Sequence, residues 1–198
     1  MQVLLLNGAK KFGSSQGKLS ATLQAVAKES LESMGFKVIQ TIIDEGYNIQ
    51  EEVQKILHSD VLIYQLPAWW MGEPWIAKKY IDEVYTEGYG TLFANDGRSR
   101  KDDNLKYGSG GLCQGKKAMF SVTWNAPLEA FNEHQGFFEG LDVEMVYFHL
   151  RKIHEFLGME VLPTFMCNDV IKNPQITQYM TEYKNHLQKN FTHFKETK

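Results

Sequence analysis

Short apolar runs constrain the fold of this chain most strongly. Val3 to Leu6 and Val61 to Tyr64 are wholly apolar, and such runs are typical of strands in a parallel sheet that is covered on both faces. Residues with apolar side chains at helical spacing follow each run further along the chain. We therefore expect an α/β protein with helices on both faces of a parallel sheet.

Strand and helix patterns alternate five times along the sequence. Strands are predicted at 3–6, 36–39, 61–64, 117–123 and 161–166, and helices at 19–34, 51–58, 75–84, 146–157 and 176–191. Gly35 and Gly158 are placed to end two helices, and Pro163 suits an edge strand. Asn173 and Pro174 suit the cap and first position of the last helix. With no internal repeat and no linker, this order predicts one domain, 1–198, built on a doubly wound, flavodoxin-like, five-stranded sheet.

Composition limits the classes of partner. The chain has 198 residues, of which 43% are hydrophobic and 23% charged, as in ordinary soluble globular proteins. The net charge of −3 gives no basis for a nucleic-acid surface, and no apolar run approaches the roughly 18 residues of a membrane span. The N-terminus lacks a signal-peptide pattern, and Cys113 and Cys167 lack CxxC spacing. We expect a cytoplasmic protein with reduced thiols, no metal site and no stable membrane insertion.

One long segment interrupts the alternation. The excursion at about 86–115 is polar and rich in glycine, with little periodicity. Loops of this length are uncommon in compact domains and usually serve a function or an interface. Within it, Gly108-Ser109-Gly110-Gly111 is typical of a flexible turn, because it does not lie between a strand and a helix as a phosphate-binding glycine motif would.

Three loops carry the candidate binding residues, because ligands of doubly wound folds bind where the strands end. The first loop contains Ser14-Ser15-Gln16-Gly17-Lys18-Leu19-Ser20. Hydroxyl groups, a glycine and free N–H groups at a helix N-terminus favour a phosphate. The alternative is that Ser15 or Gln16 simply caps the helix.

The second loop follows the strand at 61–64 and reads Pro67-Ala68-Trp69-Trp70-Met71-Gly72. Pro67 ends strand pairing because it has no N–H for the ladder, and Gly72 closes the turn. Large aromatic side chains at the end of a buried strand favour a flat ring as the ligand. The alternative is that the two tryptophans are core or subunit-contact residues.

The third loop, Thr123-Trp124-Asn125-Ala126, follows the strand at 117–123. Its peptide N–H groups and the Asn125 side chain could meet one edge of a planar ligand, with Trp124 stacking or packing beside it. The alternative is a tight turn in which Trp124 fills the sheet edge. Tyr107 and Phe131 are further aromatic candidates for the same region, and ordinary packing is the alternative for each.

Several well-known motifs do not occur. There is no GxGxxG or GxxxxGK[ST] after the first strand, and no HExxH or GxSxG, so Rossmann, nucleoside-triphosphate, metalloprotease and serine-hydrolase interpretations lack support. His149 and His154 lie five apart in a predicted helix, a spacing that does not place two ligands on one face. His134 is distinguished only because it follows the third loop, and no catalytic residue is assigned beyond this candidate.

Longer segments carry a resemblance to a known family. They are NGAKKF at 7–12, PAWWMGEPW at 67–75, KKYIDEVYTEGYGTL at 78–92, DGRSRKD at 96–102, KYGSGGL at 106–112 and TWNAP at 123–127, followed by FLGME, LPTF and NDVIK. Together they run nearly end to end and are more specific than any single motif. The chain resembles the bacterial FAD-dependent NADPH:quinone oxidoreductases of the modulator of drug activity B type, in the flavodoxin-like quinone reductase family.

This resemblance implies FAD bound by the three loops. At the phosphates it implies Ser15, Gln16, Gly17, Lys18, Leu19, Ser20, Ala21 and Thr22. At the isoalloxazine ring it implies Ala68, Trp69, Trp70 and Met71, and at the other edge of the ring Thr123, Trp124, Asn125 and Ala126. The family works as a homodimer with active sites at the subunit interface, which gives the excursion and its Tyr107 a purpose. Mammalian relatives carry a Tyr and a His after the third loop, where this chain has Phe131 and His134.

The implied activity is the two-electron reduction of quinones to hydroquinones, by hydride transfer through FAD in a ping-pong mechanism with NADPH as co-substrate. Peptide N–H groups of the third loop would stabilise negative charge on the reduced ring. Two alternatives are a flavodoxin-type electron carrier with FMN and a regulatory subunit of a membrane ion-efflux system. Arg98, Arg100 and Lys101 are the best nearby cations for a 2′-phosphate, although a solvated basic turn explains them equally well.

Overall fold

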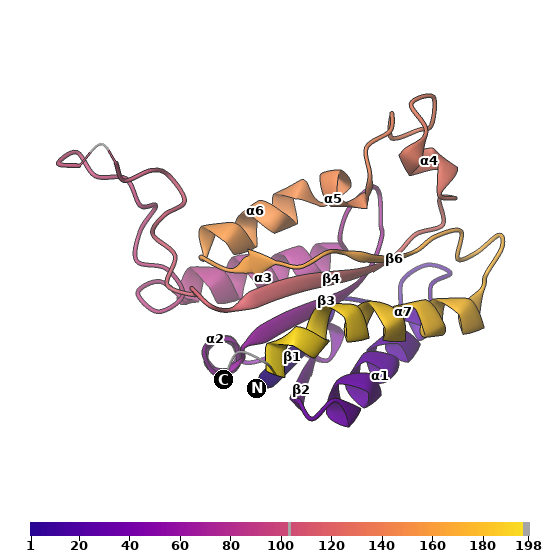
Figure 1. Ribbon diagram of the computed structural model, residues 1–198, viewed down its shortest axis with the longest axis horizontal. Helices are drawn as coiled ribbons and strands as arrows, with labels where there is room; N and C mark the ends of the chain where they lie inside the picture. The colour runs from indigo at the N-terminus through magenta and orange to yellow at the C-terminus, as the bar shows by residue number, and fades with distance from the viewer. Residues whose placement is uncertain (103, 196–198) are drawn as a thin grey trace.

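A central sheet separates two layers of helices, and the excursion extends away from one end of it (Figure 1). The computed structural model describes residues 1–102 and 104–195. Residue 103 of the excursion and residues 196–198 of the predicted domain lie outside the described residues. The predicted α/β class is confirmed, and no described helix is both long and apolar enough to cross a membrane.

The sheet has the strand order β2-β1-β3-β4-β5, and its named strands pair in parallel. The inner strands are β1 (Gln2–Asn7), β3 (Val61–Pro67) and β4 (Lys117–Thr123), and β2 (Lys37–Ile42) forms one edge. The opposite edge is interrupted: β5 (Glu160–Val161) and β6 (Phe165–Cys167) both pair with β4. Pro163 lies between these two pieces and cannot donate to the ladder. The predicted doubly wound order is confirmed.

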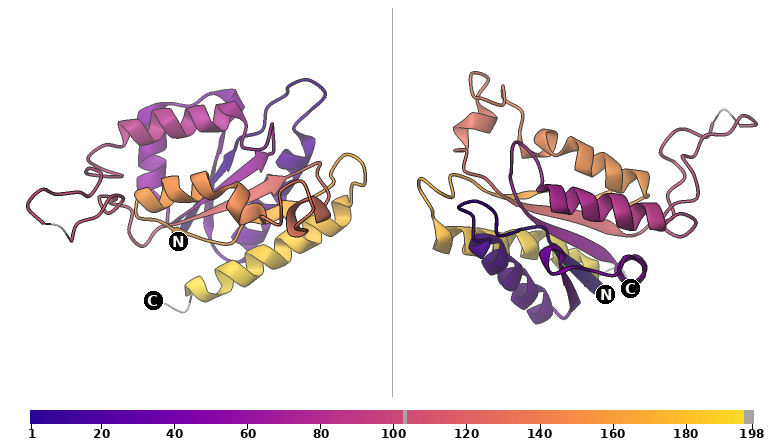
Figure 2. Two further views of the ribbon diagram at one scale, coloured as in Figure 1. Left: turned by 90° about the horizontal axis from the view of Figure 1, so that it is seen from above. Right: turned by 180° about the vertical axis from the view of Figure 1, so that it is seen from behind.

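Helices cover both faces of the sheet (Figure 2). The first face carries α1 (Lys18–Ser33) and α7 (Ile176–Phe191), and the second carries α2 (Ile49–His58), α3 (Trp75–Glu87) and α6 (Phe148–Phe156). Shorter elements are η1 (Ile43–Glu45), α4 (Glu129–Asn132), α5 (Val143–Val146) and η2 (Thr192–Lys195). Because β1 and β3 are covered on both sides, successive side chains enter alternate cores: Val3 and Leu5 face α1 and α7, while Leu4 and Leu6 face the other layer.

Some helices begin at other residues than predicted, because capping side chains determine where a helix starts. The helix predicted at 51–58 begins earlier, because the Asn48 side chain accepts a hydrogen bond from Glu51 N at 3.0 Å. The predicted cap at Asn173 is wrong. Its Oδ1 accepts from Gln175 Nε2 at 2.8 Å, and α7 begins only at Ile176. The helix predicted at 146–157 is divided at Tyr147 into α5 and α6.

The excursion is held by hydrogen bonds between its two limbs. Ala94 N donates to Gly110 O at 2.8 Å, and Leu112 N donates to Leu92 O at 2.9 Å. A Cβ atom at Gly111 would lie 2.2 Å from the Leu157 carbonyl carbon, so a glycine is needed for this close packing. The predicted turn is present at 107–108, whereas Gly111 is packed closely against Leu157.

A buried hydrogen-bond chain connects the sheet with two helices of one layer. Tyr64 OH lies 2.6 Å from Tyr85 OH, which lies 2.8 Å from Nε2 of His154. His154 Nδ1 lies 2.8 Å from the Leu150 carbonyl oxygen. A carbonyl only accepts, so Nδ1 carries the proton and Nε2 accepts from Tyr85. Burial lowers the pKa of His154 to about 4, and the neutral ring completes the chain.

The burial of His154 predicts that the protein loses stability in mild acid. The pKa of His154 is about 4 in the folded state and about 6.5 in the unfolded state. Between these values the unfolded chain binds more protons, so the free energy of unfolding should fall as the pH is lowered, by up to about 3 kcal/mol from this residue. Urea unfolding at a series of pH values measures this change in the free energy of unfolding. The variant His154→Gln should be less stable at neutral pH but lose less stability in acid; equal losses would contradict the assignment.

Candidate functional site

The parallel register brings the ends of three strands to one edge of the sheet. Asn7 of β1 pairs with Gln65 of β3, and Pro67 of β3 pairs with Thr123 of β4. The Ala68 N–H donates to the Thr123 carbonyl at 2.8 Å, so the second and third loops start in contact. This edge lies at the end of the sheet opposite the excursion (Figure 1).

The first loop leaves the N-terminus of α1 uncapped. Gly17 is the N-cap residue, with a φ of 66°, and no side chain makes a capping hydrogen bond. Ser15 Oγ reaches only Gly17 N, at 3.4 Å, so the capping alternative is wrong. The backbone N–H groups of the first helical turn have no acceptor within the described part of the chain. They belong to Lys18, Leu19 and Ser20. An anion is stabilised at such a helix end.

The last two predicted phosphate residues lie further into α1. Ala21 N–H already donates to Gly17 O at 3.0 Å, and Thr22 Oγ1 donates to Lys18 O at 3.0 Å. Gln16 and Lys18 are exposed, whereas Ser20 is buried. The structure therefore gathers these residues around one helix end, where those from Ser15 to Ser20 lie closest to the unbonded N–H groups.

The second loop is a strained turn that exposes an indole. Trp69 and Gly72 exchange two backbone hydrogen bonds, of 2.9 and 3.2 Å. Between them, Trp70 has a φ of 47° and Met71 a φ of 69°, which costs a non-glycine residue roughly 1 to 2 kcal/mol. The Trp70 side chain is 97% exposed, so a core role is excluded for it. Such strain clusters at functional sites.

The other residues of the turn have different surroundings. The Trp69 ring lies 5.1 Å from the ring of Phe12, which joins the second loop to the first. Gly72 does not have a positive φ, and a Cβ atom there would meet no atom within 4 Å. The left-handed conformations on which the turn depends are therefore at Trp70 and Met71, while Gly72 borders open space.

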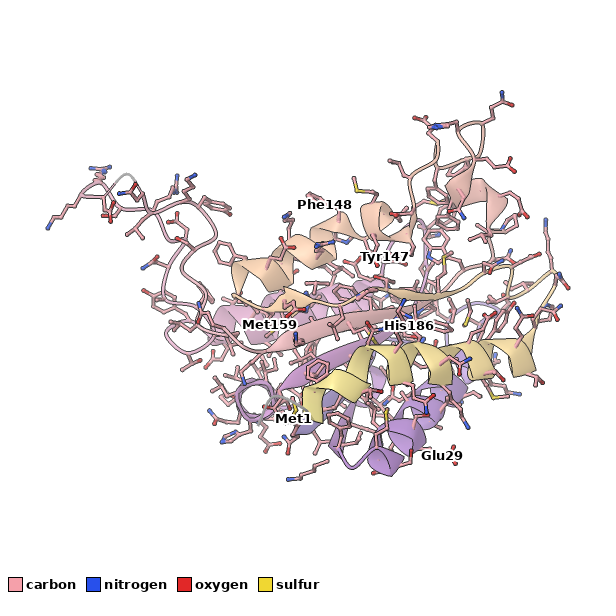
Figure 3. All side chains as sticks on the ribbon, viewed as in Figure 1. Met1, Glu29, Tyr147, Phe148, Met159 and His186 are labelled. Atoms are coloured by element: carbon pink, nitrogen blue, oxygen red, sulfur yellow. The ribbon has the colours of Figure 1, made fainter. Side chains whose placement is uncertain are left out.

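In the third loop, packing accounts for the aromatic residues. Trp124 is 5% exposed, and its ring contacts Phe131, Phe138 and Tyr147. Phe131 is fully buried and stacks on Phe138 at 4.4 Å. The packing alternatives were therefore correct for Trp124 and Phe131. Figure 3 labels Tyr147 on the sheet side of the α5–α6 junction, next to this cluster.

The polar groups of the third loop remain available in part. Trp124 N–H donates to Cys167 O at 2.8 Å, and Asn125 Oδ1 accepts from Ile171 N at 3.2 Å. The N–H groups of Asn125 and Ala126 find no acceptor among the residues that the structure describes. Thr123 is buried at the end of β4. Two peptide donors of the third loop are therefore free to bind a ligand.

Tyr107 and the basic residues of the excursion are not brought to the three loops of the same chain. Tyr107 is 71% exposed, and its ring lies 5.6 Å from Phe156 and 5.6 Å from Arg98 Cζ. Arg98 is paired with Asp96 at 2.5 Å. His134 follows α4 and is exposed. The sequence analysis placed Tyr107 near the third loop. That placement requires the Tyr107 of a second chain.

Two features of the site had no signal in the sequence. Gln65 is 2% exposed, and neither its Oε1 nor its Nε2 has a hydrogen-bond partner among the described residues. A buried amide without a partner is rare, and here it lies beneath the edge where the loops meet. Glu73, directly after the exposed turn, is 2.7 Å from Nε2 of His149 on α6. Only spatial proximity reveals this pair, since 76 positions separate its members.

These observations fit a phosphate-bearing planar cofactor such as FAD. The uncapped end of α1 suits a phosphate, while the exposed Trp70 and the open space beside Gly72 suit a ring. The unbonded N–H groups of Asn125 and Ala126 suit carbonyl or anionic ring atoms. Within residues 1–102 and 104–195, no three His, Cys, Asp or Glu side chains gather closely enough to hold a metal ion.

Comparison with known proteins agrees with this geometry. Residues 1–189 match the model of a family described by its flavodoxin-like fold. The chain is 52% identical over 191 residues to the NADPH:quinone oxidoreductase MdaB of Haemophilus influenzae, covering 96% of this chain and 100% of the relative.

Solved structures show the same fold at low identity. A candidate quinone reductase from Klebsiella pneumoniae has a TM-score of 0.74 at 22% identity, covering 98% of this chain and 85% of that one. General stress protein 14 from Treponema denticola, in complex with FMN, has a TM-score of 0.66 at 18% identity, covering 95% and 98%. The match over 1–189 and the long identity to the Haemophilus enzyme confirm the resemblance, and the chain belongs to the family with the flavodoxin-like fold.

Proposed function

We propose that this protein is an NADPH:quinone oxidoreductase that uses FAD for two-electron reduction. The observation that carries the proposal is the turn that holds Trp70 fully exposed, at the start of which Ala68 bonds to Thr123 of the loop with the unbonded N–H groups of Asn125 and Ala126. Its 52% identity to a protein named as an NADPH:quinone oxidoreductase supports the choice of substrates. An electron carrier is less favoured, because the long excursion would have no role in it.

The first loop would hold the phosphates of FAD. Lys18, Leu19 and Ser20 offer unbonded N–H groups, and the helix dipole of α1 adds partial positive charge at the same place. Ser15, Gln16 and Gly17 precede this end and would cover the phosphates. Gly17 has a φ of 66°, so a residue with a side chain would be strained at this approach to the helix.

The second loop would position the ring. Trp70 and Met71 are the exposed residues of the turn and would form the wall, with Ala68 at its base. Trp69 would act less directly, because its ring already packs on Phe12. The space beside Gly72 would be filled when the ring is bound, and the indole of Trp70 would exclude water from that face.

When bound, FAD would supply the hydride-accepting and hydride-donating chemistry, which no side chain of the chain provides. The N–H groups of Asn125 and Ala126 would stabilise negative charge on its ring, because they lack acceptors among the described residues. NADPH and the quinone would use the same exposed face in turn. His134 is exposed on the segment after α4, so we assign it no proton transfer.

The working form would be a homodimer. The excursion, which carries Tyr107, extends from the end of the sheet opposite the three loops of its own chain (Figure 1). Beside it, a groove of about 410 Å³ between α3 and α6 is lined by apolar side chains that include Ile81, Phe93 and Phe156. A second copy would cover this groove and bring its own Tyr107 to the loops of the first. The excursion would then complete the partner's site.

Cofactor and kinetics provide the first test. The purified protein should be yellow and release FAD on denaturation, and initial rates with NADPH and a soluble quinone should give the parallel lines of a ping-pong mechanism. Release of FMN would overturn the choice of cofactor. Intersecting lines would overturn the shared site. A flavin-loaded protein that does not oxidise NADPH in the presence of quinone would favour the electron carrier.

The open space beside Gly72 provides the second test. Gly72→Val should change the free energy of unfolding by less than about 1 kcal/mol, since a Cβ atom there meets no neighbour within 4 Å. It should weaken FAD binding by at least about tenfold, because the added methyl groups would occupy the space of the ring. Gly72→Ala should have a smaller effect on affinity. Unchanged affinity in both variants would place the ring elsewhere.

Complementation between subunits tests the dimer. The variants Tyr107→Ala and Gly72→Val should each have low quinone reductase activity, because each impairs both sites of its homodimer. In a mixed dimer, one site would combine an intact turn with an intact Tyr107 from the partner, while the other would carry both defects. Recovery of about half of the wild-type activity per mixed dimer is expected. No recovery would mean that Tyr107 acts within its own chain or not at all.

A further inference from the structure

An ion pair lies directly beside the exposed turn. Glu73 follows the Trp69–Gly72 turn, and its Oε2 is 2.7 Å from Nε2 of His149. The Glu73 side chain is 8% exposed and that of His149 is 47% exposed. His149 belongs to the first turn of α6, so the pair ties the second loop to a helix that is remote in the sequence.

His149 also connects to the third loop. Its ring lies 6.4 Å from that of Tyr147, inclined by 28° to it, and Tyr147 packs on Trp124 at 6.2 Å. In Figure 3, Tyr147 lies on the sheet side of the chain and Phe148 on the outer side, in agreement with their burial. A continuous series of contacts therefore runs from the third loop through Tyr147 and His149 to the second loop.

We propose that Glu73 and His149 are positioning residues for the ring-binding turn, which they hold against α6 most firmly when His149 is protonated. This inference rests on the proposed function, because the turn matters for the reaction only if it carries the flavin ring. Glu73 and His149 act through the backbone of the Trp69–Gly72 turn, which Glu73 directly follows.

The strain of the turn gives the pair its role. Trp70 and Met71 adopt left-handed conformations, which relax in a free chain and persist only where surrounding contacts hold them. The turn itself has two hydrogen bonds, between Trp69 and Gly72. A partly buried ion pair on the next residue supplies a further anchor, and its strength depends on charge.

Neighbouring charges set the protonation of the pair. The hydrogen bond to Glu73 raises the pKa of His149 above its ordinary value, against the effect of burial. Burial opposes the ionisation of Glu73, but the hydrogen bond from His149 holds the pKa of Glu73 below its ordinary value. Lys78 of α3 is the other charged group that faces the pair, and it repels protonated His149 while it attracts Glu73. Tyr147 is the facing titratable group of the α5–α6 junction, and its burial raises the pKa of the phenol.

These contacts determine how flavin affinity changes with pH. Because the folded pKa of His149 is raised, the charged pair is complete at low pH and is lost as the pH rises through that value. Flavin affinity should therefore fall with rising pH, by about three- to tenfold for a half-exposed pair. Removing Lys78 should move the midpoint of this fall to higher pH, because a repulsion on protonated His149 disappears.

Equilibrium binding of FAD between pH 6 and pH 9 tests the inference, with wild type, Glu73→Gln, His149→Gln and Lys78→Gln. Both variants of the pair should bind FAD three- to tenfold more weakly than wild type at pH 6 and show little dependence on pH. Lys78→Gln should keep the dependence with a raised midpoint. Arg151→Gln is the matched control, because Arg151 lies on the same helix and pairs with Glu155 at 2.7 Å, away from the turn; it should follow wild type.

A second measurement separates this inference from the proposed function. In flavin-free protein, the indole N–H resonance of Trp70, assigned with Trp70→Phe, should titrate with the midpoint of His149 in wild type and not in Glu73→Gln. Wild type that binds no flavin would contradict the proposed function, and this resonance would then decide the positioning role alone. Wild-type affinity and pH dependence in His149→Gln, or a Trp70 resonance that ignores pH, would overturn the inference.

Discussion

Parallel pairing on both sides of β3 is the constraint on which the rest of the structure depends. Asn7 stands beside Gln65, and Pro67 stands beside Thr123, so three loops that are far apart in the sequence must start at one edge. The register cannot slip by one residue, because Leu62 and Ile63 belong to opposite cores. The strict alternation of two buried faces thereby places the candidate site.

Two histidines of α6 have contrasting roles in holding that site together. His154 is fully buried and joins α6 to β3 through Tyr85 and Tyr64, so this end of the helix is fixed by a neutral hydrogen-bond chain. His149, five residues earlier, is half-exposed and reaches Glu73 after the turn. Because the helix is anchored at one end, a contact at its other end can hold a strained loop. A mobile helix would transmit no such restraint.

Most of the fold could be predicted from the sequence, but only part of the site. The apolar runs of β1, β3 and β4 were recognisable because burial on both faces favours apolar residues at successive positions. The extent of α7 was predicted, but its cap was wrongly placed at Asn173, since a cap depends on the path of the chain before the helix. Composition could not distinguish Trp70 from Trp124: one projects from a left-handed turn and the other packs on Phe131. The Glu73–His149 pair, and a Gln65 side chain without a partner among the described residues, arise from tertiary contacts alone.

Exposed aromatic residues occur at both ends of the molecule. Trp70 lies at the edge where the strands end, whereas Tyr107 lies on the excursion beside the groove of α3 and α6. In an isologous dimer, every contact of one subunit with its partner occurs twice, so a single interface would cover both grooves and bring each Tyr107 to the opposite Trp70. The length of the excursion would then be set by the distance to the partner's loops, and not by the fold of its own chain.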